Sequence, residues 1–104
     1  MEKPNYELCS LKQLMELIQY GKTDEMANEA WKRYKKKGGD DWEYFALNGK
    51  TDEIANEAWK RYKDNGGDDW KYFAEYGKKE MIINEAKSRI YDISEFLSIT
   101  YDNR

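Results

Sequence analysis

Hydrophobic residues recur along this chain at the spacing of amphipathic helices. A long apolar stripe, within residues 24–37, consists of Met26, Ala27, Ala30, Trp31 and Tyr34. Shorter stripes with the same spacing occupy residues 11–18 and 42–46. Thr23 precedes the long stripe as an expected N-cap, and Gly38-Gly39 follows it as an expected helix end. This pattern predicts helices joined by loops of two or three residues.

The helical pattern repeats along the chain. Residues 21–48 return as residues 49–76 with six differences, and a degenerate third copy begins at Gly77. The differing pairs are 26/54, 36/64, 37/65, 43/71, 47/75 and 48/76. Each copy contains a long helix, called the A helix, and a short helix over residues 41–48 or 69–76, called the B helix. Asp40 is the expected cap of the first B helix.

A period of 28 residues falls in the range of stacked repeat architectures. We therefore predict a single all-α domain over residues 1–104, a short solenoid-like stack of antiparallel helical hairpins. A B-type helix over residues 10–20 precedes repeat 1 (21–48) and repeat 2 (49–76), and residues 77–104 form a degenerate capping repeat. About six helices are expected, in the order B–A–B–A–B–A. The cap is inferred because Lys87 replaces the tryptophan of positions 31 and 59.

Composition excludes several classes of site. The 104 residues include no histidine and only one cysteine, Cys9. Histidine-based acid–base catalysis and Ser-His or Cys-His nucleophilic sites are thus excluded, and a zinc site is disfavoured. The paired carboxylates Asp40-Asp41 and Asp68-Asp69 are interpreted as helix caps rather than as an acid–base or metal site. We predict a protein that is not an enzyme, with no catalytic residue, no cofactor and no metal.

The chain carries no apolar run near the roughly 20 residues needed to span a bilayer. Its first nine residues lack the apolar core of a signal peptide, and a single cysteine forms no internal disulfide. These features predict a cytoplasmic, intracellular location without membrane contact.

Candidate binding residues lie on the expected outer faces of the helices. Tyr44 and Tyr72 stand opposite the buried face of the B helices, where an aromatic side chain suits either a partner or the next layer. The charged candidates recur on the two A helices and are Glu29, Lys32, Arg33, Glu57, Lys60 and Arg61. Their recurrence indicates either a recent duplication or one surface presented twice to a partner. Asn28 and Asn56 also recur, and an asparagine within a helix indicates a hydrogen bond between layers or to a ligand.

The leading hypothesis is a non-catalytic helical-repeat protein that binds another protein, as a small adaptor or inhibitor of a larger machine. The alternative is nucleic-acid binding through the Lys/Arg-rich ends of the A helices. A net charge of −3 and the glutamates interleaved with the basic residues favour the protein partner.

Overall fold

The computed structural model describes residues 4–102, with side chains up to Tyr91, and this part of the chain contains helices and no strands. A short 3-10 helix, η1 (Tyr6–Leu8), comes first. Six α-helices follow within the described range: α1 (Leu11–Tyr20), α2 (Asp24–Lys36), α3 (Trp42–Asn48), α4 (Asp52–Asp64), α5 (Trp70–Tyr76) and α6 (Glu80–Asp102). The prediction of an all-helical chain with alternating B and A helices is confirmed.

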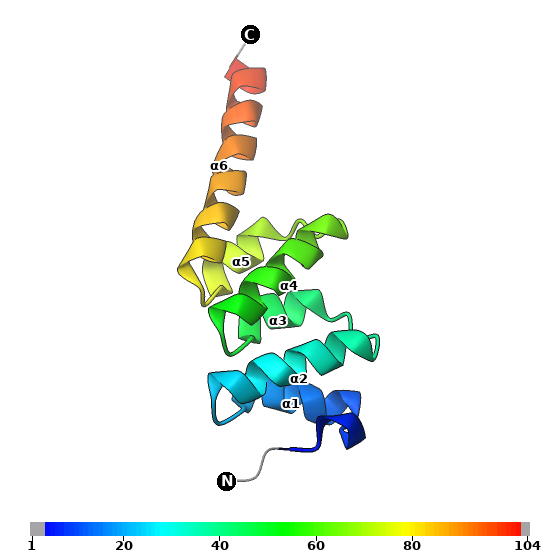
Figure 1. Cartoon of the computed structure of the whole chain (residues 1–104). Coiled ribbons are helices and arrows are strands. Elements are labelled where there is room, and N and C mark those ends of the chain that lie inside the picture. Colours follow the sequence, from blue (N-terminus) through cyan, green and yellow to red (C-terminus); the bar gives the residue numbers. More distant parts are fainter. Residues whose placement is uncertain (1–3, 103–104) are drawn as a thin grey trace.

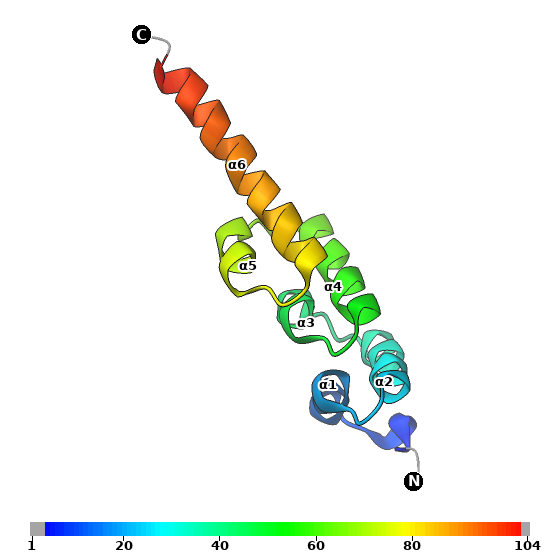
Figure 2. The ribbon, with the colours of Figure 1, turned by 90° about the vertical axis from the view of Figure 1, so that its left-hand side faces the viewer.

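The helices stand in two columns. The B helices α1, α3 and α5 lie on one side and the A helices α2, α4 and α6 on the other (Figure 2). The molecule is elongated, with extents of 67 × 23 × 15 Å, and the last turns of α6 extend beyond the other helices (Figure 1). Its radius of gyration is 17.0 Å, against about 13 Å for a compact domain of 100 residues.

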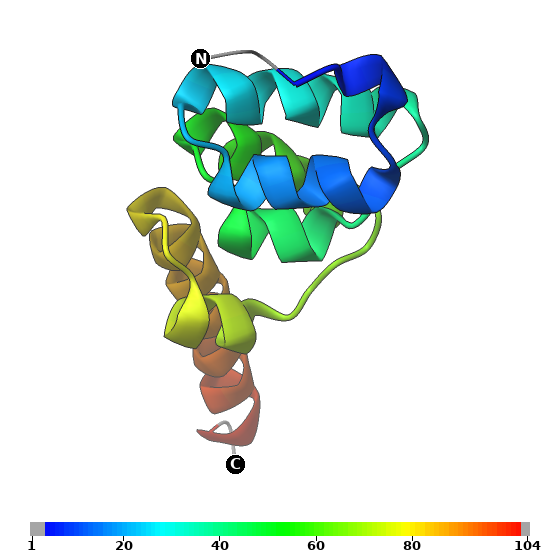
Figure 3. The same cartoon turned by 90° about the horizontal axis from the view of Figure 1, so that it is seen from below.

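The closest helix pairs are α1 with α2, α3 with α4, and α5 with α6. The pair α1/α2 is seen side by side in Figure 3. Each pair, called a layer below, is joined by a loop that begins with Gly-Lys. The hairpin expected within residues 21–48 is therefore not the closest pair, and the packing unit is shifted by half a repeat. The reason is bulk: α2 meets α3 through large rings, with Trp31 centred 5.8 Å from Trp42.

The tryptophans of the A helices pack on the B helix that follows, which belongs to the same 28-residue repeat and to the next layer. Trp31 also lies 5.6 Å from Phe45 between ring centroids, and Trp59 lies 4.8 Å from Phe73. Both tryptophans are 3% exposed, whereas Lys87 at the equivalent position of α6 is exposed. These rings and the fully buried aliphatic side chains form one continuous core along the stack.

The loop between each A helix and the following B helix is held by a tyrosine. The Tyr34 hydroxyl accepts a hydrogen bond from the backbone N–H of Asp41 at 3.0 Å, and Tyr62 does the same for Asp69 at 2.9 Å. Gly38 turns the first of these loops with φ +92°. The N-cap of α3 is Asp41, so the expectation that Asp40 caps this helix is wrong by one residue. The Tyr34 hydroxyl, which the glycine turn brings close, is the acceptor for the Asp41 N–H.

Candidate functional site

Glu57 is the centre of a hydrogen-bond network between α2 and α4. Its carboxylate accepts from Trp31 Nε1 at 3.0 Å, from Lys35 Nζ at 2.7 and 2.8 Å, and from Arg61 Nε at 2.9 Å. Burial alone would raise the pKa of the Glu57 carboxyl, but the hydrogen bonds from Lys35, Trp31 and Arg61 outweigh burial and lower it. The Glu57 carboxylate therefore holds the first two layers together.

The same network recurs between α4 and α6. Glu85 accepts from Trp59 Nε1 at 2.9 Å, from Lys63 Nζ at 2.8 and 2.9 Å, and from Arg89 Nη2 at 3.2 Å. Burial alone would raise the pKa of the Glu85 carboxyl. The hydrogen bonds from these donors outweigh burial, so the pKa is again below the ordinary value. Packing between layers thus accounts for the recurrence of the glutamate and of its lysine and arginine partners. It does not account for Lys32 and Lys60, which lie outside both networks.

The charged candidates of the first layer contact the N-terminal segment. Arg33 pairs with Glu7 of η1 and with Glu29 at 3.3 Å. Lys32 Nζ makes a long contact of 3.9 Å with Glu29 Oε2, and the Lys32 side chain remains 69% exposed. Lys60, at the equivalent position of α4, is also exposed. Lys32 and Lys60 are therefore accessible on the surface of the A helices.

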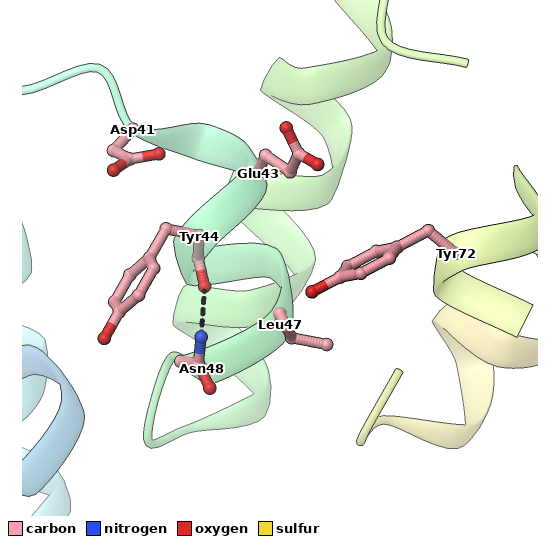
Figure 4. A pocket seen from close by; sticks show the side chains of 6 residues that line it. All are labelled: Asp41, Glu43, Tyr44, Leu47, Asn48 and Tyr72. Carbon is pink, nitrogen blue, oxygen red and sulfur yellow. Dashed lines mark hydrogen bonds between the residues drawn. The ribbon is translucent and has the colours of Figure 1, made fainter. Parts of the chain in front are cut away.

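The two tyrosine candidates lie in the B-helix column. The Tyr44 hydroxyl donates a hydrogen bond to Gln19 Oε1 of α1, which links α3 to the preceding layer. Tyr72, at the equivalent position of α5, points toward α3 (Figure 4). There the position equivalent to Gln19 is Leu47, which has no hydrogen-bonding side chain. Among the described residues, no hydrogen bond therefore links the Tyr72 hydroxyl to α3.

An open hollow of about 320 Å³ remains between these helices and is called the α3–α5 groove. It is lined by Asp41, Glu43, Tyr44, Leu47, Asn48 and Tyr72 (Figure 4). Tyr72 projects from α5 toward Leu47 and Glu43, while the Tyr44 ring lies on the other side of α3 (Figure 4). Tyr44 and Tyr72 thus contribute to one groove, and the charged candidates lie on the A helices.

A second hollow, also about 320 Å³, adjoins the groove at the N-terminal end of α3. Its lining includes Tyr62 and the loop before α5, and it shares Asp41 and Glu43 with the α3–α5 groove. Burial raises the pKa of the Tyr62 hydroxyl, and the nearby negative charge of Glu43 raises it further. Asp41 and Glu43 therefore stand between two hollows.

The sequence pattern did not single out Glu43, Leu47 or Asn48 as binding residues. A signal was present, because positions 43, 47 and 48 account for half of the six differences between the two repeats. All three line the groove in the first repeat. Packing keeps the rest of the two copies nearly identical and leaves these positions free to differ.

A third hollow, of about 400 Å³, lies at the start of α6 and is lined by Asn56 and Lys79 among others. One layer earlier, Thr51 Oγ1 donates to Asn28 Oδ1 at 2.7 Å and accepts from the N–H of Ile54 at 3.2 Å. Asn28 thus makes a hydrogen bond between layers, one of the two roles expected for it. Lys79 replaces Thr51 at the equivalent position, and Asn56 Oδ1 is buried without a hydrogen-bond partner among the described residues.

The side chains that the structure describes, residues 4–91, contain no group of three or more suited to hold a metal ion. No helix among the described residues is long and apolar enough to cross a membrane. Comparison of the chain with models of protein families, with curated proteins and with solved structures finds no match.

Proposed function

We propose that this chain is a short solenoid-like stack of 28-residue repeats that binds another protein without catalysis. It would act inside the cell as a small adaptor or inhibitor of a larger machine. The observation that supports this most is the α3–α5 groove, which combines an aromatic ring, an aliphatic side chain and carboxylates on an open surface. Tyrosine is enriched where proteins meet, since its ring buries a large area and its hydroxyl forms hydrogen bonds.

The B-helix column offers more exposed aromatic surface than the groove alone. Tyr20 at the end of α1 is 73% exposed and Tyr76 at the end of α5 is 60% exposed. Tyr76 lies 5.2 Å from Tyr72 between ring centroids, so the aromatic surface continues past the groove along α5. A partner that lies across α3 and α5 would cover the rings of Tyr72 and Tyr76.

The A-helix column is a weaker candidate for the same role. Glu57, Arg61 and Arg33 already pair with residues of this chain, so a partner would have to break contacts that hold the layers. The same pairing weakens the alternative of nucleic-acid binding, because Lys35 and Lys63 are bound to glutamates. Lys32 and Lys60 remain for phosphate contacts, and binding through them would fall steeply with added salt.

The proposal is tested by a photo-crosslinking amino acid placed at one position at a time in cells of the source. Leu47 reports on the groove, and Lys60, exposed on the A-helix column, is the matched control position. We expect a discrete adduct with one protein from position 47, stable to nuclease, and none from position 60. A competing copy with Leu47→Glu should not remove the adduct, whereas an excess of the unlabelled original chain should.

Leu47→Glu is a suitable variant because Glu75 occupies the equivalent position in the second repeat, so this helix type accepts the residue. No protein adduct from position 47 would contradict the proposal. A nuclease-sensitive adduct from position 60 alone would favour the nucleic-acid alternative.

A further inference from the structure

We infer that the α3–α5 groove receives a basic side chain of the partner, an arginine or a lysine flanked by apolar residues. The inference rests on the proposed protein-binding function and specifies the chemistry of the partner. It is carried by two properties of the groove: carboxylates without ion pairs, and an apolar wall beside an aromatic ring.

The carboxylates of Asp41 and Glu43 are available. Neither forms an ion pair with a described residue, in contrast to Glu57 and Glu85. Asp41 is the N-cap of α3 but its side chain makes no capping hydrogen bond, whereas the Asp69 side chain accepts from the N–H of Tyr72 at 3.4 Å. Two negative charges therefore face a space that no side chain of this part of the chain neutralises.

The wall opposite these carboxylates suits the rest of a long basic side chain. Arginine and lysine bury their methylene groups on apolar surface while the charged end stays near water. Leu47 provides apolar surface, and the Tyr72 ring points toward it (Figure 4). A cation over the face of an aromatic ring is attracted by the ring quadrupole. Among the described residues an arginine already makes this contact twice, with Arg61 4.9 Å from the Trp42 centroid and Arg89 5.0 Å from Trp70.

The positive charges of the chain near the groove leave the carboxylates free. Lys78 Nζ donates to Asn48 Oδ1 at 2.8 Å, at the C-terminal end of α3. Asp41 and Glu43 lie at the N-terminal end of this seven-residue helix, about 10 Å away along its axis. Arg61 lies over the Trp42 ring at that end, but its ion pair is with Glu57. Neither Lys78 nor Arg61 therefore forms an ion pair with Asp41 or Glu43.

The acidic end belongs to this groove alone. The position of Glu43 is taken by Lys71 in the second repeat, and that of Leu47 by Glu75. At the equivalent positions α5 carries Asp69 and Glu75 together with Lys71. A basic side chain is thus favoured more on α3, where no lysine accompanies the carboxylates. The repeats also supply matched variants, since Glu43→Lys and Lys71→Glu each exchange a residue between two equivalent helices.

The test uses the full chain and three tripeptide amides, acetylated at the N-terminus, as probes: Leu-Arg-Leu, Leu-norleucine-Leu and Leu-Glu-Leu. Binding is followed by amide chemical shifts in two-dimensional NMR spectra. We expect the arginine peptide to shift signals of residues 41–48 and 70–76, with a dissociation constant near 1 mM, which corresponds to about −4 kcal/mol. The norleucine peptide should bind about tenfold more weakly, and the glutamate peptide should cause no shift in this region.

In the variants, Glu43→Lys should weaken the arginine peptide about tenfold or more, and Lys71→Glu should leave its affinity unchanged. Unchanged amide shifts elsewhere in Glu43→Lys would show that the variant is folded. Equal binding of all three peptides, or equal loss in both variants, would overturn the inference. A protein adduct from position 47 together with no preference for the arginine peptide would overturn the inference while leaving the proposed function in place.

Discussion

The start of α6 carries a defect that a single substitution should repair. Thr51 caps α4 and donates to Asn28, so one hydroxyl serves as acceptor and donor at once. Lys79 holds the same position before α6, where its carbonyl accepts from the N–H of Ile83 at 3.0 Å. An ammonium group has no acceptor, so its side chain cannot cap the helix. Lys79→Thr should restore both hydrogen bonds.

The expected gain follows from three terms. A threonine N-cap is worth about 1 kcal/mol relative to a residue that cannot cap. A hydrogen bond to the buried Asn56 Oδ1 adds about 1 kcal/mol. The lost ion pair of Lys79 with Asp52, 3.1 Å long with the Asp52 side chain 81% exposed, costs at most about 0.5 kcal/mol. The net stabilisation is about 1.5 kcal/mol, which should raise the melting temperature by roughly 5–10 °C.

Urea unfolding followed by tryptophan fluorescence measures this gain as a shift of the midpoint at constant slope. Lys79→Ala is the control, since it removes the ion pair without adding a cap or a donor, and it should be neutral or slightly destabilising. In an Asn56→Ala background the gain from Lys79→Thr should fall by about 1 kcal/mol, to about 0.5 kcal/mol, which is the cap less the lost ion pair. If Lys79→Thr is no more stable than Lys79→Ala, the structural explanation is wrong.

Two further predictions concern the layers and the loops. The pKa of Glu57 and of Glu85 is lowered from 4.5 in the folded chain, so their stabilisation is present above about pH 4.5 and is lost as pH falls through the lower folded values; urea midpoints between pH 7 and pH 3 should show this loss, and Glu57→Gln should reduce it, with an unchanged pH profile refuting the assignment. Gly38→Ala should cost about 1–2 kcal/mol through backbone strain alone, because φ is +92° while no atom lies within 4 Å of the added Cβ. Gly39→Ala should cost more, since its Cβ would overlap the Tyr34 ring. Thermal melts of the two variants measure the difference, and equal costs would contradict this account.

The sequence pattern was sufficient for the helices and for the tryptophans, because both follow from the spacing of apolar residues along one helix. The partner of each tryptophan N–H was not predictable in this way. Glu57 lies on a different layer from Trp31, and which carboxylate it meets depends on how two helices are offset. Glu57 therefore looked like a surface residue in the sequence.

The α3–α5 groove was also out of reach of the helical pattern. Tyr44 and Tyr72 occupy equivalent positions of the two repeats, and the adjacent difference, Glu43 against Lys71, does not predict what each hydroxyl contacts. Their difference comes from Gln19 and Leu47, residues of the preceding layer that become relevant only once the layers are placed. The differences between the repeats pointed to these positions, but packing was needed to show that they share one surface.

The network between layers has a direction. The A helix of one layer contributes the donors, such as Trp31 and Lys35, and the A helix of the next contributes the acceptor, Glu57. The helix α4 carries both parts: Glu57 accepts from α2, and Trp59 donates to Glu85 of α6. The side of α4 that faces α2 is therefore complementary to the side that faces α6. Such a head-to-tail contact does not close on itself. A chain of this kind can lengthen by copying a unit in place, with every new junction already matched, and only its two end units must evolve separately.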